Sequence, residues 1–120
     1  MAYSIMVVDD DPAILMMVGL VLEDAGYNTH LVSNPMDAVA IAYAERPDLV
    51  VLDLMMPALN GGMVYNLLRE RTLTSDIPVI VSSASIDIDA RAAAMGVPYV
   101  LPKPFTPAEL IAIIQRALNP

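Results

Sequence analysis

Short apolar runs alternate with helical segments of about a dozen residues along the whole chain. The runs that we predict to be β-strands cover residues 5–8, 28–32, 48–52, 79–81 and 99–101. Four of them are apolar almost throughout, which is typical of strands in the middle of a parallel sheet with helices on both faces. The run at 28–32 has the weakest pattern, because His30 lies there among polar neighbours.

Helix boundaries fall between these runs. Asp11, Asn34 and Thr106 each stand directly before a proline, which is the arrangement of an N-cap followed by proline at the first helical position. Gly26 and Gly96 follow two predicted helices, where glycine is common. The predicted helices cover residues 12–25, 35–46 and 62–72, a segment that ends at 95, and a segment from 107 onward. Five strands and five helices in strict alternation predict an α/β fold with a doubly wound parallel sheet.

Polar side chains follow four of the five predicted strands. They are Asp9, Asp10 and Asp11 after the first strand, Asp53 after the third, Ser82 and Ser83 after the fourth, and Lys103 after the fifth. The carboxyl ends of parallel strands meet at one edge of the sheet, where doubly wound folds bind their ligands. These residues therefore form the candidate site.

The acidic residues at this edge differ in how easily they are explained. Asp11 has a structural explanation, since it caps the helix that begins at Pro12. Any one of Asp9, Asp10 and Asp53 could likewise be a cap or turn residue, but that explanation is weaker for the three together, because clustered carboxylates repel one another. A hard cation such as Mg²⁺ relieves that repulsion, since it binds carboxylate, water and phosphate oxygens.

Ser83 and Lys103 have ordinary explanations when each is taken alone. A serine at a strand end is often a satisfied hydroxyl, and a single lysine is usually a solvated charge. Lys103, however, stands between Pro102 and Pro104 after an apolar strand, which indicates a fixed position.

Length and composition limit the class of protein. With 120 residues the chain can form one hydrophobic core but not two, so we expect a single domain over residues 1–120. Apolar residues make up 57%, yet no apolar run approaches the roughly 20 residues that span a bilayer. Without cysteines or a basic leader, the chain is expected to be cytoplasmic, with no membrane insertion. The net charge of −8 disfavours direct binding to nucleic acid.

Four sequence blocks make the interpretation specific. They are IMVVDDD at 5–11, PDLVVLDLMMP at 47–57 with Gly61 after it, PVIVSSA at 78–84, and PKPF at 102–105. In order and spacing, these blocks resemble those of the receiver domains of bacterial response regulators, and they cover the chain from end to end. The resemblance implies a (βα)5 flavodoxin-like fold with strand order 2-1-3-4-5.

The resemblance also assigns roles to the acidic residues. It implies that Asp53 accepts a phosphoryl group. It further implies that Mg²⁺, or Mn²⁺, is bound by Asp9, Asp10, Asp53 and the backbone carbonyl of Met55.

The remaining strand-end residues receive roles in the same way. Ser83, Ala84 and Lys103 would bind the phosphoryl group and respond to it, and the Lys103–Pro104 peptide bond would be cis. The resemblance implies a sensor histidine kinase or a histidine phosphotransfer protein as donor. A downstream effector, which the sequence does not identify, would read the state of a monomer or weak dimer.

Two positions depart from the family pattern. The family usually has an aromatic switch residue three places before the lysine, and this chain has Val100 there. Tyr99 is one place earlier and should face the other side of the sheet. Met55 and Ser85, two places after the acceptor and after Ser83, are where the family tunes loss of the phosphoryl group. A bulky Met55 predicts slow hydrolysis.

The helix at 12–25 carries a candidate docking surface. Its spacing predicts a buried stripe of Ile14, Met17, Val18, Val21 and Ala25. That leaves Leu15, Met16, Leu20 and Leu22 on or beside the exposed face. We predict that Leu15, Met16 and Leu20 form a patch beside the phosphorylation site where the kinase or phosphotransfer protein docks. The competing interpretation is that they are scattered exposed apolar residues, which are common.

Two other functions are consistent with parts of this pattern. One is an interaction module that no longer needs phosphorylation, although the acceptor, acids, hydroxyl and lysine are all present. The other is a Mg²⁺-dependent phosphatase with an aspartyl-phosphate intermediate. Such enzymes generally have a second aspartate two residues after the nucleophile, where this chain has Met55.

Overall fold

The computed structural model describes residues 2–55 and 61–120, in which strands and helices alternate strictly. The elements are β1 Ser4–Val8, α1 Pro12–Asp24, β2 Asn28–Val32, α2 Pro35–Glu45, β3 Leu49–Asp53, α3 Gly61–Glu70, β4 Val79–Ser83, α4 Ile88–Met95, β5 Tyr99–Pro102 and α5 Pro107–Leu118. Within the described residues, no helix combines the length and apolar character needed to cross a bilayer.

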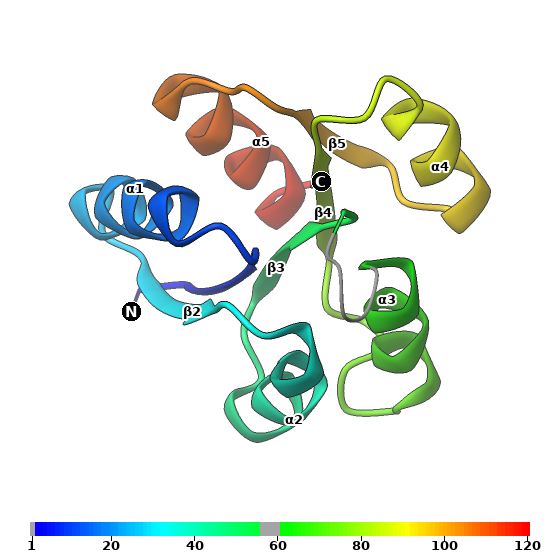
Figure 1. The fold of residues 1–120 in the computed structure, drawn as a ribbon. Coiled ribbons are helices and arrows are strands. Elements are labelled where there is room, and N and C mark those ends of the chain that lie inside the picture. Colours follow the sequence, from blue (N-terminus) through cyan, green and yellow to red (C-terminus); the bar gives the residue numbers. More distant parts are fainter. Residues whose placement is uncertain (1, 56–60) are drawn as a thin grey trace.

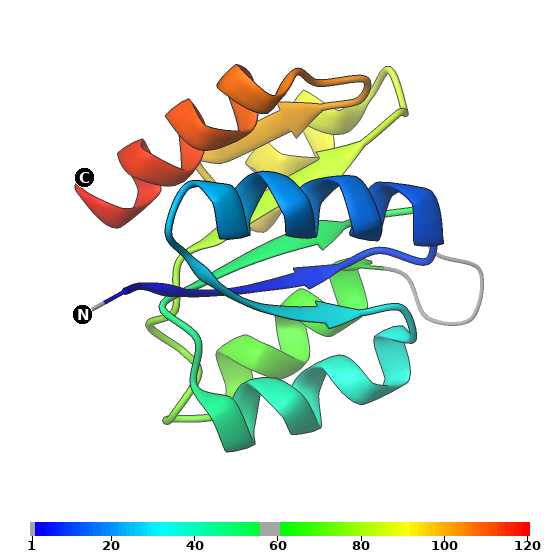
Figure 2. The ribbon, with the colours of Figure 1, turned by 90° about the vertical axis from the view of Figure 1, so that its left-hand side faces the viewer.

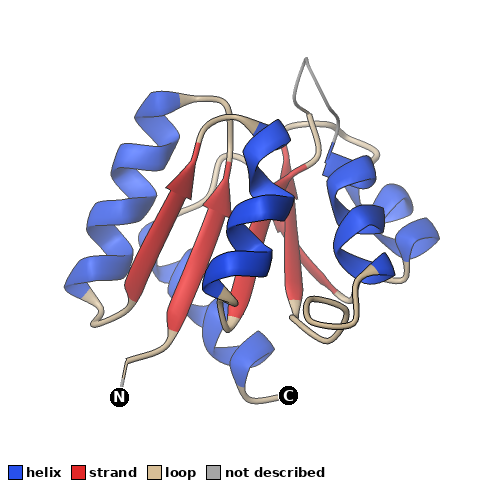
Figure 3. Cartoon of the chain, turned by 90° about the horizontal axis from the view of Figure 1, so that it is seen from below, coloured by secondary structure: helices blue, strands red, loops and turns tan. Residues whose placement is uncertain are grey.

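The five strands form one parallel sheet (Figure 3). Their order is β2-β1-β3-β4-β5, as predicted. In the register, Asp53 lies opposite Ser82, and Ser83 lies opposite Pro102. The carboxyl ends of β3, β4 and β5 therefore meet at one edge, and the side chains that follow them are brought together there.

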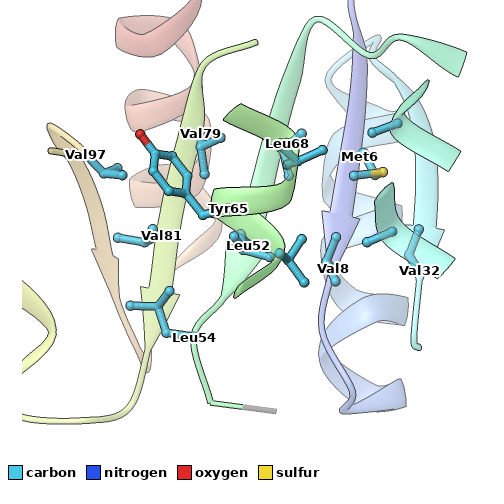
Figure 4. Close-up of a cluster of buried hydrophobic side chains, with 14 of the residues drawn as sticks. Met6, Val8, Val32, Leu52, Leu54, Tyr65, Leu68, Val79, Val81 and Val97 are labelled. Atoms are coloured by element: carbon cyan, nitrogen blue, oxygen red, sulfur yellow. The ribbon is translucent and has the colours of Figure 1, made fainter. Parts of the chain in front are cut away.

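Helices cover both faces of the sheet, with α1 and α5 on one side and α2, α3 and α4 on the other (Figures 1 and 2). Alternate residues of each central strand pack into the two resulting cores. One core holds Met6, Val8, Val50, Leu52, Val79 and Val81 against α2, α3 and α4 (Figure 4). The other holds Ile5, Val7, Leu49, Val51 and Ile80 against α1 and α5. Both faces of β1, β3 and β4 are thus buried, which explains why these runs are apolar throughout.

Tyr99 and Val100 face opposite sides of the sheet, as expected. Val100 packs against the core beneath α2, α3 and α4, whereas Tyr99 packs against the core beneath α1 and α5. Tyr99 therefore does not occupy the place of the aromatic switch residue.

The predicted N-caps are confirmed. The Asp11 side chain accepts hydrogen bonds from the N–H groups of Ala13 and Ile14, and Asn34 accepts one from Met36. Thr106 forms a capping box with Glu109. Gly96 ends α4 with φ 75°, a conformation that favours glycine.

Helix α3 ends earlier than predicted, at Glu70 instead of residue 72. The buried Thr74 hydroxyl donates to the carbonyl of Leu68 at 2.6 Å. The Arg69 guanidinium donates to the carbonyls of Ser75 and Ile77. These bonds fold the following segment back under the helix end, which stops the helix.

The predicted orientation of α1 is wrong in part. Leu15 is 7% exposed and Leu22 is fully buried, so both belong to the core. The buried stripe is Leu15, Val18, Gly19 and Leu22, while Ile14, Met17 and Val21 lie at its margins and Ala25 is exposed. Leu31 of β2 packs over Gly19, where an added Cβ would lie 2.8 Å from Leu31 Cδ1. Because Leu31 of β2 covers this glycine, the side of α1 that contains Gly19 is buried, which the spacing of the apolar residues alone does not indicate.

Candidate functional site

Three charged side chains from three strands meet at the carboxyl edge of the sheet. Lys103 Nζ lies 2.7 Å from Asp9 Oδ2 and 3.4 Å from Asp53 Oδ2. The two carboxylates are almost completely buried, and the lysine is mostly so. One ammonium group therefore pairs with two acids, which leaves the cluster with a negative charge.

The environment of Asp53 disfavours its ionised form. Burial has the largest effect and raises the pKa of Asp53. The hydrogen bond from the Met55 N–H lowers this pKa, and the charge of Asp9 raises it. Lys103 lowers this pKa, but the net direction is upward. The Met55 N–H donates to Asp53 Oδ1 at 3.0 Å. The carboxylate is thus fixed in place and only partly neutralised.

Lys103 remains an ammonium ion in the same environment. Burial lowers the pKa of Lys103, but the hydrogen bond to Asp9 and the charges of Asp53 and Asp9 outweigh it, so the net direction is upward. An ammonium group at this position can pair with an anion that approaches Asp53.

Asp10 completes a group of three acids that could hold a cation. Asp9, Asp10 and Asp53 each offer a carboxylate oxygen, and these atoms lie within 4.8 Å of one another. Asp10 is exposed, whereas the other two are buried. All three groups offer carboxylate oxygens in a cluster with excess negative charge, which fits Mg²⁺. Met55, whose carbonyl is the further expected ligand, joins the site through its N–H.

Two adjacent serines end β4, and the structure separates their roles. The Ser82 hydroxyl donates to the carbonyl of Leu101 at 2.8 Å, which commits it to the contact with β5. The buried Ser83 hydroxyl accepts a hydrogen bond from the N–H of Ser85. The Ser85 hydroxyl in turn donates to Asp87 at the start of α4. Ser83 is therefore connected through its loop to α4.

The Lys103–Pro104 peptide bond is cis, as expected. A cavity of about 220 Å³ lies beside it, lined by Ile14, Met17, Ala84, Lys103, Pro104 and Phe105. Ala84 and Lys103 thus line the same cavity. The sequence did not predict that Phe105 and residues of α1 would line this cavity, because their positions depend on how the β5–α5 loop folds back.

Arg91 of α4 is a second residue that the sequence analysis missed. Its Nη1 lies 3.3 Å from Sδ of Met55, two residues after Asp53. Arg91 belongs to none of the four sequence blocks, so nothing in the sequence pattern places it near Asp53.

The predicted docking patch is only partly exposed. Met16 and Leu20 are 68% and 64% exposed, as predicted, but Leu15 is buried and the prediction for it is wrong. The exposed apolar surface of α1 consists of Met16 and Leu20, with Leu31 of β2 beside Gly19.

Comparison with known proteins agrees with this geometry. The sequence model of the response regulator receiver domain matches residues 5–115. The chain belongs to the response regulator receiver domains. The chain is 36% identical to the DNA-binding response regulator MtrA of Mycolicibacterium smegmatis, over 99% of this chain and 52% of that protein. This receiver domain thus spans about half the length of the relatives it matches.

Solved structures show the same fold for this receiver domain. The chemotaxis protein CheY4 of Vibrio cholerae superposes with a TM-score of 0.91 at 28% identity, covering 98% of this chain and all of that one. The receiver domain of the sensor histidine kinase PA1611 of Pseudomonas aeruginosa has the same TM-score and identity, and both chains are covered completely. That structure has a magnesium ion coordinated in its active site cleft.

Proposed function

We propose that this receiver domain takes a phosphoryl group onto Asp53 from a sensor histidine kinase or a histidine phosphotransfer protein. The observation that carries the proposal is the contact of Lys103 with both Asp9 and Asp53 at the carboxyl edge. A buried carboxylate that is only partly neutralised, with a fixed cation beside it, suits attack on an anionic phosphoryl group.

In the transfer, an oxygen of Asp53 bonds to phosphorus as the bond from phosphorus to the donor's imidazole nitrogen breaks. The nitrogen keeps the electron pair. Lys103 exchanges part of its contact with the two carboxylates for a phosphoryl oxygen, which spreads the added charge. Mg²⁺, when bound, would stabilise charge on the transferring oxygens, and Asp9, Asp10, Asp53 and the Met55 carbonyl would hold it.

Phosphorylation would change the partner surface through Ser83. Its hydroxyl can donate to a phosphoryl oxygen, and this movement would draw in the loop that connects Ser83 through Ser85 and Asp87 to α4. Val100 stands where the family has an aromatic switch, so the loop carries the change in this chain. An effector protein would bind the altered surface.

The expected partners follow from charge and exposure. Met16 and Leu20 on α1 are the candidate docking residues for the donor protein, since they are exposed and α1 borders the cavity beside Lys103. The net charge of −8 supports a domain that makes no direct contact with nucleic acid, even where a relative binds DNA. We expect a cytoplasmic domain that is a monomer or weak dimer.

Labelling with acetyl phosphate tests the proposal. With Mg²⁺, intact mass should rise by one phosphoryl group, about 80 Da, in the wild type. Asp53→Asn should show no increase. Equal labelling of this variant contradicts the assignment, and an unlabelled wild type would favour a phosphorylation-independent module.

A further inference from the structure

Arg91 contacts the residue that fixes the acceptor carboxylate. Its Nη1 donates to Met55 Sδ at 3.3 Å, and the Met55 N–H donates to Asp53 Oδ1 at 3.0 Å. Arg91 lies in the first turn of α4, which starts after the carboxyl end of β4. Through Met55 the guanidinium is therefore held at the edge of the sheet that carries Asp53.

The contact that holds Arg91 is a weak one. A thioether sulfur is a poor hydrogen-bond acceptor, whereas a guanidinium binds carboxylates and phosphates through paired N–H groups. In the part of the chain that the structure describes, no carboxylate lies within ion-pair distance of Arg91. Asp87, one helical turn earlier, is occupied by the Ser85 hydroxyl. Arg91 is half-buried and Met55 is 57% exposed, so an anion in solution can reach the pair.

The placement of the basic residues sets Arg91 apart. Arg46, Arg69, Arg71 and Arg116, four of the six basic residues, lie at the carboxyl ends of α2, α3 and α5. Each of these helices follows a strand and runs back across the sheet (Figure 3), so its carboxyl end lies at the edge opposite to the one where Asp53 ends β3. Lys103 and Arg91 are the two that remain near the acceptor, and Lys103 is already paired with Asp9 and Asp53. Arg91 is thus the cation at this edge whose charge is not matched by an acid.

We propose that Arg91 binds the phosphodonor: its guanidinium leaves Met55 Sδ and pairs with the anionic oxygens of a small acyl phosphate before transfer to Asp53. The inference rests on the proposed phosphorylation of Asp53. It gives the domain a way to attract a free dianionic donor to an edge where three carboxylates, Asp9, Asp10 and Asp53, would otherwise repel it. A purely structural role, in which Arg91 packs α4 against the residues after β3, would affect stability and leave donor affinity unchanged.

The test compares rates of labelling over a range of acetyl phosphate concentrations, with saturating Mg²⁺. Arg91→Met removes the charge and keeps an unbranched apolar chain against Met55. We expect the half-saturating concentration to rise about three- to tenfold, with a smaller change in the maximal rate. Arg116→Met removes the same charge at the opposite edge and should behave as the wild type. Arg91→Lys should recover part of the affinity.

The outcomes separate this inference from the proposed function. An unlabelled wild type would refute the phosphorylation of Asp53 itself. A labelled wild type with equal half-saturating concentrations in Arg91→Met and Arg116→Met would refute only the role of Arg91. Equal weakening in Arg91→Lys and Arg91→Met would also refute it, because charge would not be the cause. A second donor, phosphoramidate, carries less negative charge and should distinguish Arg91→Met from the wild type less strongly.

Discussion

Lys103 Nζ lies 3.4 Å from Asp53 Oδ2, at the long end of hydrogen-bonding distance. Its closer partner is Asp9, at 2.7 Å. The Asp53 carboxylate therefore shares its counter-ion with another acid, and the balance of burial and charge raises the pKa of Asp53. A further cation near Asp53 would therefore stabilise its ionised carboxylate.

The raised pKa of Asp53 predicts a pH-dependent gain in stability for Asp53→Asn. The folded state holds the Asp53 proton more tightly than the unfolded state, so the ionised carboxylate lowers the free energy of unfolding. In EDTA at neutral pH, we expect the variant to be more stable by on the order of 1 kcal/mol. The gain should shrink as pH falls through the folded-state pKa and disappear below the ordinary aspartate value of about 3.9. Urea unfolding at several pH values measures it, and a gain that does not vary with pH would be inconsistent with this origin.

Mg²⁺ should stabilise the unphosphorylated domain. Asp9, Asp10 and Asp53 offer oxygens within 4.8 Å of one another only in the folded state, so binding shifts the folding equilibrium. At ten times Kd the gain is about 1.4 kcal/mol. Thermal melts with and without Mg²⁺ measure this gain, and Asp10→Ala is the matched control because Asp10 is exposed. If Asp10→Ala gains as much as the wild type, the ion binds elsewhere.

Leu15 and Met16 are neighbours on α1 with opposite expected effects on stability. Leu15 is buried in the core beneath α1 and α5, so Leu15→Ala should lower the free energy of unfolding by about 3 kcal/mol. Met16 is mainly exposed, and Met16→Ala should change it by less than about 0.5 kcal/mol. Urea unfolding of both variants measures the difference, and equal losses would place Met16 in the core as well.

Met16 should instead affect transfer from the donor protein. Met16→Glu places a charge on the exposed surface of α1, so it should slow transfer from the cognate kinase at least tenfold, a loss of about 1.4 kcal/mol. Labelling by acetyl phosphate should stay unchanged, since that small donor does not need the surface. Asp37→Asn on the exposed face of α2 serves as a control. Normal transfer to Met16→Glu would show that docking occurs elsewhere.

Met55 should lengthen the life of the phosphorylated state. Its N–H donates to the Asp53 carboxylate, and its Sδ accepts from Arg91. We expect the side chain, held at this edge of the sheet, to hinder the approach of water. Loss of phosphate from Met55→Asn should be several-fold faster, about threefold or more. Met36→Asn, a change at an exposed methionine of α2, should decay as the wild type does. Decay of the phosphoprotein after removal of the donor measures both rates, and an unchanged rate in Met55→Asn removes Met55 from this role.

The residues that could be predicted are those whose position follows from the topology. Asp9, Asp53 and Lys103 each follow a strand, and parallel strands bring their carboxyl ends together whatever the details of packing. Asp11 and Thr106 could be assigned as caps because capping depends on neighbours within one turn.

The errors arise where contacts between distant elements decide the outcome. The apolar spacing of α1 leaves Leu15 outside the predicted stripe, whereas in the structure Leu15 is buried on the same side as Gly19, which Leu31 of β2 covers. Thr74 ends α3 through a hydrogen bond made after the helix, so the helical pattern continues past the true end. Arg91 meets Met55 across two loops, and no local spacing encodes that contact.

The backbone N–H of Lys103 donates to the carbonyl of Ser83 at 3.0 Å, as the last rung of the ladder between β4 and β5. The hydroxyl and the ammonium that would grip the phosphoryl group are thus on backbones tied to each other. A displacement of one must strain or carry the other, so the loop to α4 and the loop to α5 are expected to shift in concert. The surfaces beside α4 and α5 would then move together. A protein bound to one of these surfaces would change the conformation of the other.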